Sequence, residues 1–225
     1  MKYKMCVWDL DGTLMNTLPT LHYYNNLSLQ HFGFQPVDYD KFTVLIKYPL
    51  GKYYQELLKM GGCPEEKIDE IADEFTHYDY EHYAVDPTLH IGEFPGVRET
   101  LNKLCGMGIR NTVLSNKYED ISKKIVSCFY PQFIEAVYGQ IASSPSKPQI
   151  GCTDRMFRES GLKKDEILIV GDTEVDMLTA KNNHFPVAAV TWGYQDAEVL
   201  RQYQPDHMID EPSQLIDIIK EINHV

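Results

Sequence analysis

The segment DLDGT, residues 9 to 13, places Asp9 and Asp11 directly after an apolar run that covers residues 3 to 8. Two acids that share the end of a buried strand repel each other unless a cation or a reaction requires both. A carboxylate is a competent nucleophile toward phosphorus, and a second carboxyl group beside it can carry protons to and from the reacting oxygens. The pair therefore predicts covalent catalysis, with Asp9 as the nucleophile and Asp11 as the proton carrier.

A simple turn or an EF-hand loop could also contain two closely spaced aspartates. Asp-Gly is common in turns, and an aspartate at a strand end can simply cap the next element. An EF-hand loop needs glycine at its sixth position and glutamate at its twelfth. Counting from Asp9, the glycine is fourth and the twelfth residue is Thr20, which excludes an EF-hand. The turn remains the structural alternative.

Two further segments carry groups that suit phosphate chemistry. Ser115 and Asn116 follow the apolar run of residues 109 to 114. Lys147 lies in the polar loop of residues 143 to 149, just before a proline that suits the first turn of a helix. A serine hydroxyl can donate a hydrogen bond to a phosphoryl oxygen, and a lysine can neutralise charge that develops in the transition state. These residues are candidates for holding a phosphate.

A second acidic pair, Asp172 and Asp176, follows the apolar run of residues 166 to 170. Their four-residue spacing at a turn-to-helix junction puts them on roughly one face. A phosphate monoester is a dianion, so an anionic nucleophile needs charge compensation, which a hard, oxygen-preferring Mg²⁺ supplies. The second pair would complete a Mg²⁺ site beside the first.

Alternating helices and apolar strands must position these groups, and this alternation predicts a parallel sheet covered on both faces. Strands are expected over residues 3–8, 109–114, 136–138, 166–170 and 187–190. Helices are expected over residues 97–105, 118–128, 149–160, 175–182 and 212–222. Ligands bind at the carboxyl ends of such strands, so the four polar segments should converge on one edge.

Residues 17 to 83 contain no convincing strand but several helical stretches, at residues 18–32, 39–46, 52–60 and 64–83. This block is an insertion between the first strand and the rest of the chain. The expected fold class is therefore α/β, a Rossmann-like parallel-sheet core with an inserted all-helical cap domain. Its boundaries are predicted as residues 1–15 and 88–225 for the core and 16–87 for the cap.

Composition excludes several classes of partner. The net charge of −12 would repel nucleic acid, although a few lysines could still hold a small anionic substrate. No apolar run reaches the ~18 residues that span a bilayer, and the N-terminus lacks the features of a signal peptide, so a cytoplasmic protein is expected. The five cysteines are scattered without a Cys-x-x-Cys pair, which predicts reduced thiols and no zinc site.

Together the four segments resemble the motifs of the haloacid dehalogenase-like hydrolase superfamily. The matching residues are DLDGT (9–13), the serine of SNK (115), the lysine of SKP (147) and GDTEVD (171–176). The helical insertion is similar to the mobile cap of that superfamily's first cap class. EFPGV (93–97) resembles the return from cap to core in the phosphoglycolate phosphatase-like branch.

This resemblance implies a role for each candidate. Asp9 would be the nucleophile and Asp11 the general acid and base, while Ser115 and Lys147 would hold phosphate, with Thr13 and Asn116 as further substrate-binding residues. Mg²⁺ is implied at the Asp9 carboxylate, the Asp11 main-chain oxygen and Asp172, with Asp176 as a further ligand or support. Members that cleave carbon–phosphorus bonds lack the second aspartate, and dehalogenases depart further from the motif, so Asp11 argues against both reactions.

The expected function is Mg²⁺-dependent hydrolysis of a small, phosphoglycolate-like phosphomonoester through an aspartyl-phosphate. The partner would be a small phosphorylated metabolite, and the protein a monomer or homodimer. Two alternatives stay open: a phosphomutase of the β-phosphoglucomutase type, and a non-catalytic module that binds a phosphorylated ligand or a partner. The intact set of reactive side chains favours an enzyme.

Overall fold

The computed structural model describes residues 2–48, 50–142 and 144–224, and the chain divides into two compact units. The first unit comprises Met1–Asn16 and Gly92–Val225, and the second comprises Thr17–Ile91. These divisions follow residues 16 and 91, whereas the sequence predicts domain boundaries after residues 15 and 87. That the two units are separate domains stays a prediction.

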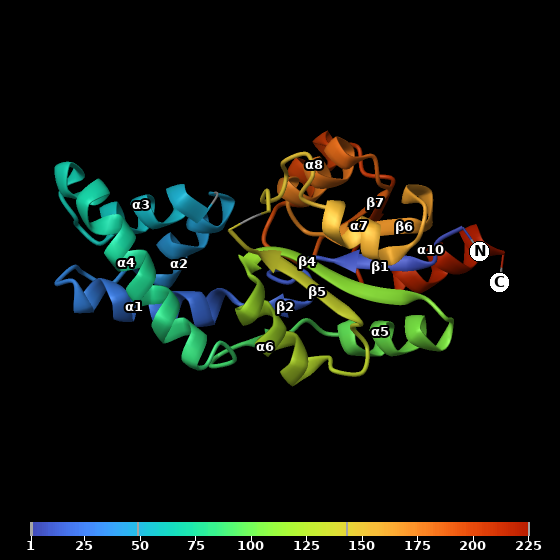
Figure 1. The fold of residues 1–225 in the computed structure, drawn as a ribbon, viewed down its shortest axis with the longest axis horizontal. Helices are drawn as coiled ribbons and strands as arrows, with labels where there is room; N and C mark the ends of the chain where they lie inside the picture. Colours follow the sequence, from blue (N-terminus) through green and yellow to red (C-terminus); the bar gives the residue numbers. More distant parts are fainter. Residues whose placement is uncertain (1, 49, 143, 225) are drawn as a thin grey trace. The chain divides into compact units, whose positions relative to one another are not determined.

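The first unit is built on a six-stranded sheet, and every pairing within it is parallel. The strands lie in the order β5-β4-β1-β6-β7-β8 (Figure 1). Their bounds are β1 Met5–Trp8, β4 Arg110–Tyr118, β5 Ala136–Gln140, β6 Ile167–Gly171, β7 Val187–Val190 and β8 His207–Ile209. β1 is buried along its whole length, because both faces of the sheet are covered and every side chain must be apolar. The predicted α/β fold is confirmed.

Helices cover both faces of this sheet. Their bounds are α5 Val97–Gly106, α6 Glu119–Phe129, α7 Asp154–Ser160, the 3₁₀ turn η2 Lys164–Glu166, α8 Glu174–Asn183, α9 Ala197–Gln202 and α10 Gln214–Asn223. α5 and α6 lie on one side of the sheet, and α7 and α8 on the other (Figure 1). On the second side, Met156 of α7 and Met177 of α8 pack with Ile169 in one buried cluster. The sheet is therefore the middle layer of three.

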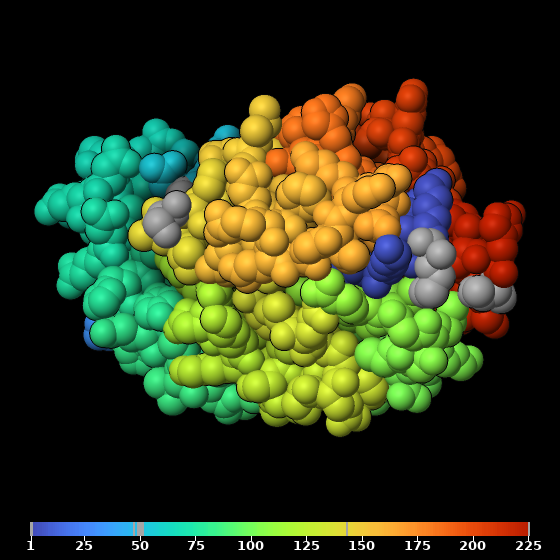
Figure 2. All heavy atoms as spheres, turned by 45° about the vertical axis from the view of Figure 1, so that its right-hand side comes forward, coloured from blue at the N-terminus to red at the C-terminus, as the bar shows by residue number. Residues whose placement is uncertain are grey.

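Both ends of the described chain are tied together at the amino ends of the strands. The Tyr3 N–H donates to Asn223 Oδ1 at 2.8 Å, and Asn223 Nδ2 donates to the Tyr3 carbonyl oxygen at 2.9 Å. Figure 2 shows the same arrangement, with the blue N-terminal segment lying next to the red C-terminal helix. The two ends of the described chain therefore lie at the edge of the sheet opposite to the carboxyl ends of the strands.

The second unit consists of helices around a small apolar core that contains Leu29, Leu57 and Phe75. Its elements are α1 Leu18–His31, α2 Tyr39–Phe42, the 3₁₀ helix η1 Thr43–Lys47, α3 Leu50–Met60 and α4 Glu65–Val85. Within the described ranges, no helix of either unit is both long and apolar enough to cross a membrane.

One buried acid joins three helices of this unit. Asp79 of α4 is only 1% exposed. Its Oδ1 accepts hydrogen bonds from Asn25 Nδ2 at 2.9 Å and Ser28 Oγ at 2.7 Å, both on α1. Its Oδ2 accepts one from the Tyr54 hydroxyl of α3 at 2.9 Å. Because each bond runs between helices, this carboxylate fixes how α1, α3 and α4 pack.

Two predicted helices differ from the structure. The helix expected over residues 149–160 begins only at Asp154, because Gly151 has a φ of +90°, which a right-handed helix does not allow. The expectation that Lys147-Pro148 opens a helix is therefore wrong. The helix expected over residues 39–46 is α2 followed by η1, so its second half is wound as a 3₁₀ helix.

Several short elements were not predicted, because they hold too few residues for a repeating apolar pattern. They are α9, β8 and the two-residue strands β2 Met15–Asn16 and β3 Gly92–Glu93, which pair antiparallel. β4 also continues to Tyr118, although a strand only to residue 114 was expected. The predicted SNK segment is thus the last part of this strand.

Candidate active site

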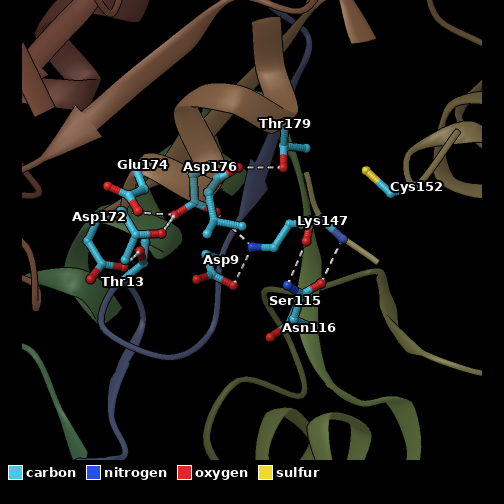
Figure 3. A network of polar contacts seen from close by, with 12 residues as sticks. Asp9, Thr13, Ser115, Asn116, Lys147, Cys152, Asp172, Glu174, Asp176 and Thr179 are labelled. Carbon is cyan, nitrogen blue, oxygen red and sulfur yellow. Dashed lines mark hydrogen bonds and ion pairs between the residues drawn. The ribbon is translucent and has the colours of Figure 1, made fainter. Parts of the chain in front are cut away.

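The candidate site lies where β1 ends, between its neighbours β4 and β6. Of the helices that follow in the first unit, α5 after β1 and α8 after β6 lie on opposite sides of the sheet (Figure 1), and such a switch point opens a crevice at the carboxyl ends of parallel strands. Asp9 follows β1, Ser115 lies in β4 and Asp172 follows β6. The predicted convergence of these segments on one edge is what the structure has (Figure 3).

Lys147 lies between two of the acids (Figure 3). Its Nζ is 2.8 Å from Asp9 Oδ1 and 2.7 Å from Asp176 Oδ1, and its side chain is buried. Burial alone would lower the pKa of Lys147, but the two carboxylates raise it well above its ordinary value. The side chain is therefore a fixed ammonium group in a site that water barely reaches.

Three carboxylates form a cluster that could hold a metal ion. Asp9, Asp172 and Asp176 each offer an oxygen, and these oxygens all lie within 4.8 Å of one another. The pKa of Asp9 is raised to about 7, chiefly by burial; Lys147 lowers it, and the charges of Asp176 and Asp11 raise it. Burial, followed by the charges of Asp176 and Asp9, raises the pKa of Asp172 well above its usual range. Crowded anionic oxygens of this kind fit a hard divalent cation, which would offset their repulsion.

Asp172 is held by both of its oxygens. Thr13 Oγ1 donates to Oδ1 at 2.7 Å, and the Tyr194 main-chain N–H donates to Oδ2 at 2.8 Å. Two glycines allow this close packing: a Cβ atom at Gly12 would lie 2.2 Å from Asp172 Oδ2, and one at Gly193 would lie 2.2 Å from Asp172 Cβ. The carboxylate is thus oriented before any ligand arrives.

The segment Trp192–Gln195, which the sequence did not lead us to expect, connects the first and last motifs. Trp192 Nε1 donates to the Thr13 carbonyl oxygen at 3.0 Å, and the Tyr194 hydroxyl donates to Asn16 Oδ1 at 3.3 Å. Gln195 Nε2 donates to Glu174 Oε2 at 2.9 Å. Its position after β7 could have drawn attention to it, since the same strand-end rule applies there.

Asp176 already has partners on both oxygens. Oδ1 contacts Lys147, and Oδ2 accepts from the N–H of Thr173 at 3.1 Å and from its hydroxyl at 2.9 Å. Thr173 is the N-cap of α8, so Asp172 lies before the helix and the predicted shared helix face does not bring the acids together. The loop and the capping box do so instead, which favours a supporting role for Asp176.

Asn116 and Lys147 exchange two hydrogen bonds. Asn116 Nδ2 donates to the Lys147 carbonyl oxygen at 2.9 Å, and the Lys147 N–H donates to Asn116 Oδ1 at 2.7 Å. Ser143, at the start of the predicted loop, lies outside the described residues. Thr13 and Asn116, both expected to bind substrate, make hydrogen bonds within the protein here, and that they bind substrate stays a prediction.

The remaining candidates, Ser115 and Asp11, both contact Lys117. Ser115 Oγ, which is nearly buried, accepts a hydrogen bond from the Lys117 N–H at 3.2 Å. Asp11 is the more exposed of the first two acids, and its Oδ1 lies 3.3 Å from Lys117 Nζ. The carboxylate of Asp11 is not part of the three-acid cluster. Metal binding through its main-chain oxygen stays a prediction.

These features can be compared with known proteins. The model of the haloacid dehalogenase-like hydrolase family matches residues 6–190, which include all four motifs. The chain belongs to this family. It is therefore a hydrolase of that superfamily, as its motifs predict.

Named relatives indicate the branch of the family to which the chain is most similar. The chain is 25% identical over 223 residues to "Phosphoglycolate phosphatase" of Aquifex aeolicus, covering 99% of this chain and 98% of the relative. It is 25% identical over 232 residues to "Pyrophosphatase PpaX" of Halalkalibacterium halodurans, covering 97% and 98%. These matches confirm the predicted phosphoglycolate phosphatase-like branch.

A solved structure supports the same fold. The haloacid dehalogenase-like family hydrolase of Streptococcus pneumoniae superposes with a TM-score of 0.79 at 20% identity. The match covers 97% of this chain and 99% of that one. Because the coverage is nearly complete, both units follow the fold of that protein.

Proposed function

We propose that this hydrolase is a Mg²⁺-dependent phosphatase that cleaves a small, phosphoglycolate-like phosphomonoester through an aspartyl-phosphate intermediate. The observation that carries the proposal is the arrangement around Asp9. Its carboxylate lies 2.8 Å from a buried lysine and within 4.8 Å of two further carboxylates. This combination provides a nucleophile, a fixed positive charge and donors for a cation at one strand end.

In the first step, a carboxylate oxygen of Asp9 attacks phosphorus and the bond between phosphorus and the ester oxygen breaks. Asp11, protonated at this stage, gives its proton to the departing alkoxide. Ser115 and Lys147 hold the phosphoryl oxygens as the charge on them changes. The products of this step are the free alcohol and phosphorylated Asp9.

In the second step, the Asp11 carboxylate takes a proton from water, and the water oxygen attacks phosphorus. The bond between phosphorus and the Asp9 oxygen breaks. Inorganic phosphate leaves, and both aspartates return to their starting protonation states. One acid thus serves as a general acid and then as a general base, which requires it to lie beside the nucleophile without being the nucleophile.

Asp9 and Asp172 would hold Mg²⁺ with their carboxylates, with the Asp11 main-chain oxygen as the further predicted ligand. Asp176 would support them, since its oxygens bind Lys147 and the start of α8. When bound, Mg²⁺ would supply positive charge that lowers the repulsion between the dianionic phosphate and the Asp9 carboxylate. Thr13 and Tyr194 orient Asp172 for this role.

The test is a screen of phosphate esters with and without Mg²⁺. It includes phosphoglycolate, nucleoside monophosphates, sugar phosphates and pyrophosphate, the last because one relative is named a pyrophosphatase. We expect Mg²⁺-dependent release of phosphate from a small monoester and none with the Asp9→Asn protein. Isomerisation of a sugar phosphate without phosphate release would identify a phosphomutase. Turnover of no ester with any divalent metal would contradict an enzymatic role.

A further inference from the structure

A second buried lysine stands beside the site and has no role in the steps above. The side chain of Lys117 is 6% exposed, and its Nζ lies 3.3 Å from Asp11 Oδ1. Placing a lysine where water is scarce costs free energy unless a counter-charge lies close by, and here that counter-charge is the acid assigned to proton transfer.

The end of β4 explains how Lys117 comes to lie there. The pairing of β4 with β5 runs regularly to Leu114 opposite Tyr138, shifts register, and resumes at Tyr118 opposite Gln140. A local irregularity of this kind redirects side chains near functional sites. Within it, the Lys117 N–H donates to Ser115 Oγ, so the lysine is fixed to the residue proposed to hold phosphate.

The two lysines of the site contact different acids. Lys147 contacts Asp9 and Asp176, which belong to the nucleophile and to the metal support. Lys117 contacts Asp11, and it comes from a different strand end. The two carboxylates of the DLDGT segment therefore have separate cationic neighbours, which matches the separate tasks proposed for them.

We propose that Lys117 is a positioning residue for Asp11. This inference rests on the proposed function and extends it. In the acid form that the first step requires, Asp11 carries its proton on one oxygen and can still accept a hydrogen bond from the Lys117 ammonium on Oδ1. This contact restricts rotation of the Asp11 side chain and so fixes the direction from which the leaving group receives its proton. Lys117 acts on proton delivery through Asp11, whereas attack by Asp9 does not require it.

Two substrates with different leaving groups separate these effects. An alkyl phosphate such as phosphoglycolate releases a strongly basic alkoxide that needs protonation, while 4-nitrophenyl phosphate releases a weakly basic phenolate that does not. Lys117→Met keeps most of the apolar stem and removes the charge. The comparison uses the rate of the first step, measured in a single turnover, because the second step needs Asp11 as a base with either ester. We expect this rate to fall about 100-fold with the alkyl ester and less than about 5-fold with the nitrophenyl ester, since correctly placed general acids contribute factors of this size. Lys117→Arg, which keeps the charge, should recover part of the loss.

Two controls accompany this comparison. Lys4→Met removes a lysine that is paired with Glu166 at the amino end of the sheet, and it should leave both rates unchanged. The rise in melting temperature on adding Mg²⁺ should be the same in Lys117→Met as in the wild type, because the described ion pair of Lys117 is with Asp11 and not with the three clustered acids.

Equal losses with both esters, or wild-type rates in both Lys117 variants, would overturn the positioning role while leaving the phosphatase intact. Should Lys117→Met fail to fold, the arginine variant decides the question. Its alkyl-to-nitrophenyl rate ratio must then fall between that of Asp11→Asn and that of the wild type. A wild-type protein that cleaves neither ester would refute the proposed function itself.

Discussion

Buried aspartates occur in both units of the chain, but their surroundings are opposite in kind. Asp172 of the first unit lies within a cluster of three carboxylates and is fully buried. Asp79 of the second unit is equally buried, yet it accepts hydrogen bonds from three neutral donors, Asn25, Ser28 and Tyr54. A buried acid is thus arranged for packing where neutral donors surround it, and for chemistry where other acids do.

The groups that surround each buried carboxylate determine whether it stabilises or destabilises the folded chain. Carboxylates that share a dry site raise one another's pKa and destabilise the folded chain, whereas a carboxylate with several donors stabilises it. Lys147 offsets part of the repulsion for Asp9 and Asp176, but the described contacts of Asp172 are with the neutral donors Thr13 and Tyr194. Neutral substitutions should therefore have opposite effects on stability in the two units.

The largest expected effect is on Asp9. Asp9→Asn replaces the nucleophile by an amide of nearly the same shape, so hydrolysis of any ester should fall by about 10⁴-fold or more. With 4-nitrophenyl phosphate and rapid acid quench, intact-mass measurement should detect no phosphorylated protein.

Asp11→Asn is the matched control for that measurement. Its nucleophile is intact, so the first step should proceed with this ester while the second step slows, and protein carrying one phosphoryl group should accumulate. A phosphorylated species in the Asp9 variant would show that the two carboxylates were assigned wrongly.

The next largest effect is on Asp172. Asp172→Asn should lose activity by about 100-fold or more, because a metal ligand is removed, and Mg²⁺ should no longer raise its melting temperature. The metal-free protein should nevertheless melt higher than the wild type, because one of three crowded charges is removed and the Thr13 hydroxyl can accept from the new amide nitrogen. The expected rise is about 2 to 4 °C, the shift that ~1 kcal/mol produces in a chain of this length. Differential scanning calorimetry with and without Mg²⁺ measures both.

Asp176→Asn is the contrasting variant within the same cluster. It weakens the contact with Lys147 and the cap of α8, so the metal-free protein should melt lower than the wild type. If both variants melt lower, crowding of the acids is not what destabilises this edge.

The sequence predicts the parts of this site that depend on the ends of apolar runs. The strand expected at residues 187–190 coincides with β7, and Asp9 and Asp172 follow strands as expected. The position of Trp192–Gln195 after β7 could have indicated this segment, but its contact with Asp172 could not be predicted, because that contact is made by a main-chain N–H and by the small size of Gly193. The direction of Lys117 depends on a register shift in β4, which tertiary pairing creates and no local pattern encodes.

In the helical unit, an aspartate-to-asparagine substitution should destabilise the protein, whereas Asp172→Asn should stabilise the metal-free protein. Asp79→Asn replaces a charged acceptor by a neutral amide with one acceptor oxygen, which weakens the hydrogen bonds that join the helices and relieves no repulsion. The free energy of unfolding should therefore fall by about 1 to 3 kcal/mol. Hydrolysis per folded molecule should stay at the wild-type level, since Asp79 belongs to the packing of α1, α3 and α4. Urea unfolding and rates measured well below the transition test the two statements. A large loss of rate in fully folded protein would give Asp79 a part in catalysis and remove the contrast between the units.

The smallest expected effect concerns one donor of that network. Tyr54→Phe removes the hydroxyl that donates to Asp79 Oδ2, and it should lower the free energy of unfolding by about 1 kcal/mol. The loss is smaller than for Asp79→Asn because the carboxylate keeps Asn25 and Ser28 and no new polar group is buried. Tyr23→Phe, at a tyrosine of α1 that is 42% exposed, is the matched control and should change stability by less than about 0.5 kcal/mol. In the double variant of Asp79 and Tyr54 the two losses should not add, because both act on one hydrogen bond. Additive losses would mean that the Tyr54 hydroxyl stabilises the helices through a partner other than Asp79, because phenylalanine keeps the ring and lacks only the hydroxyl.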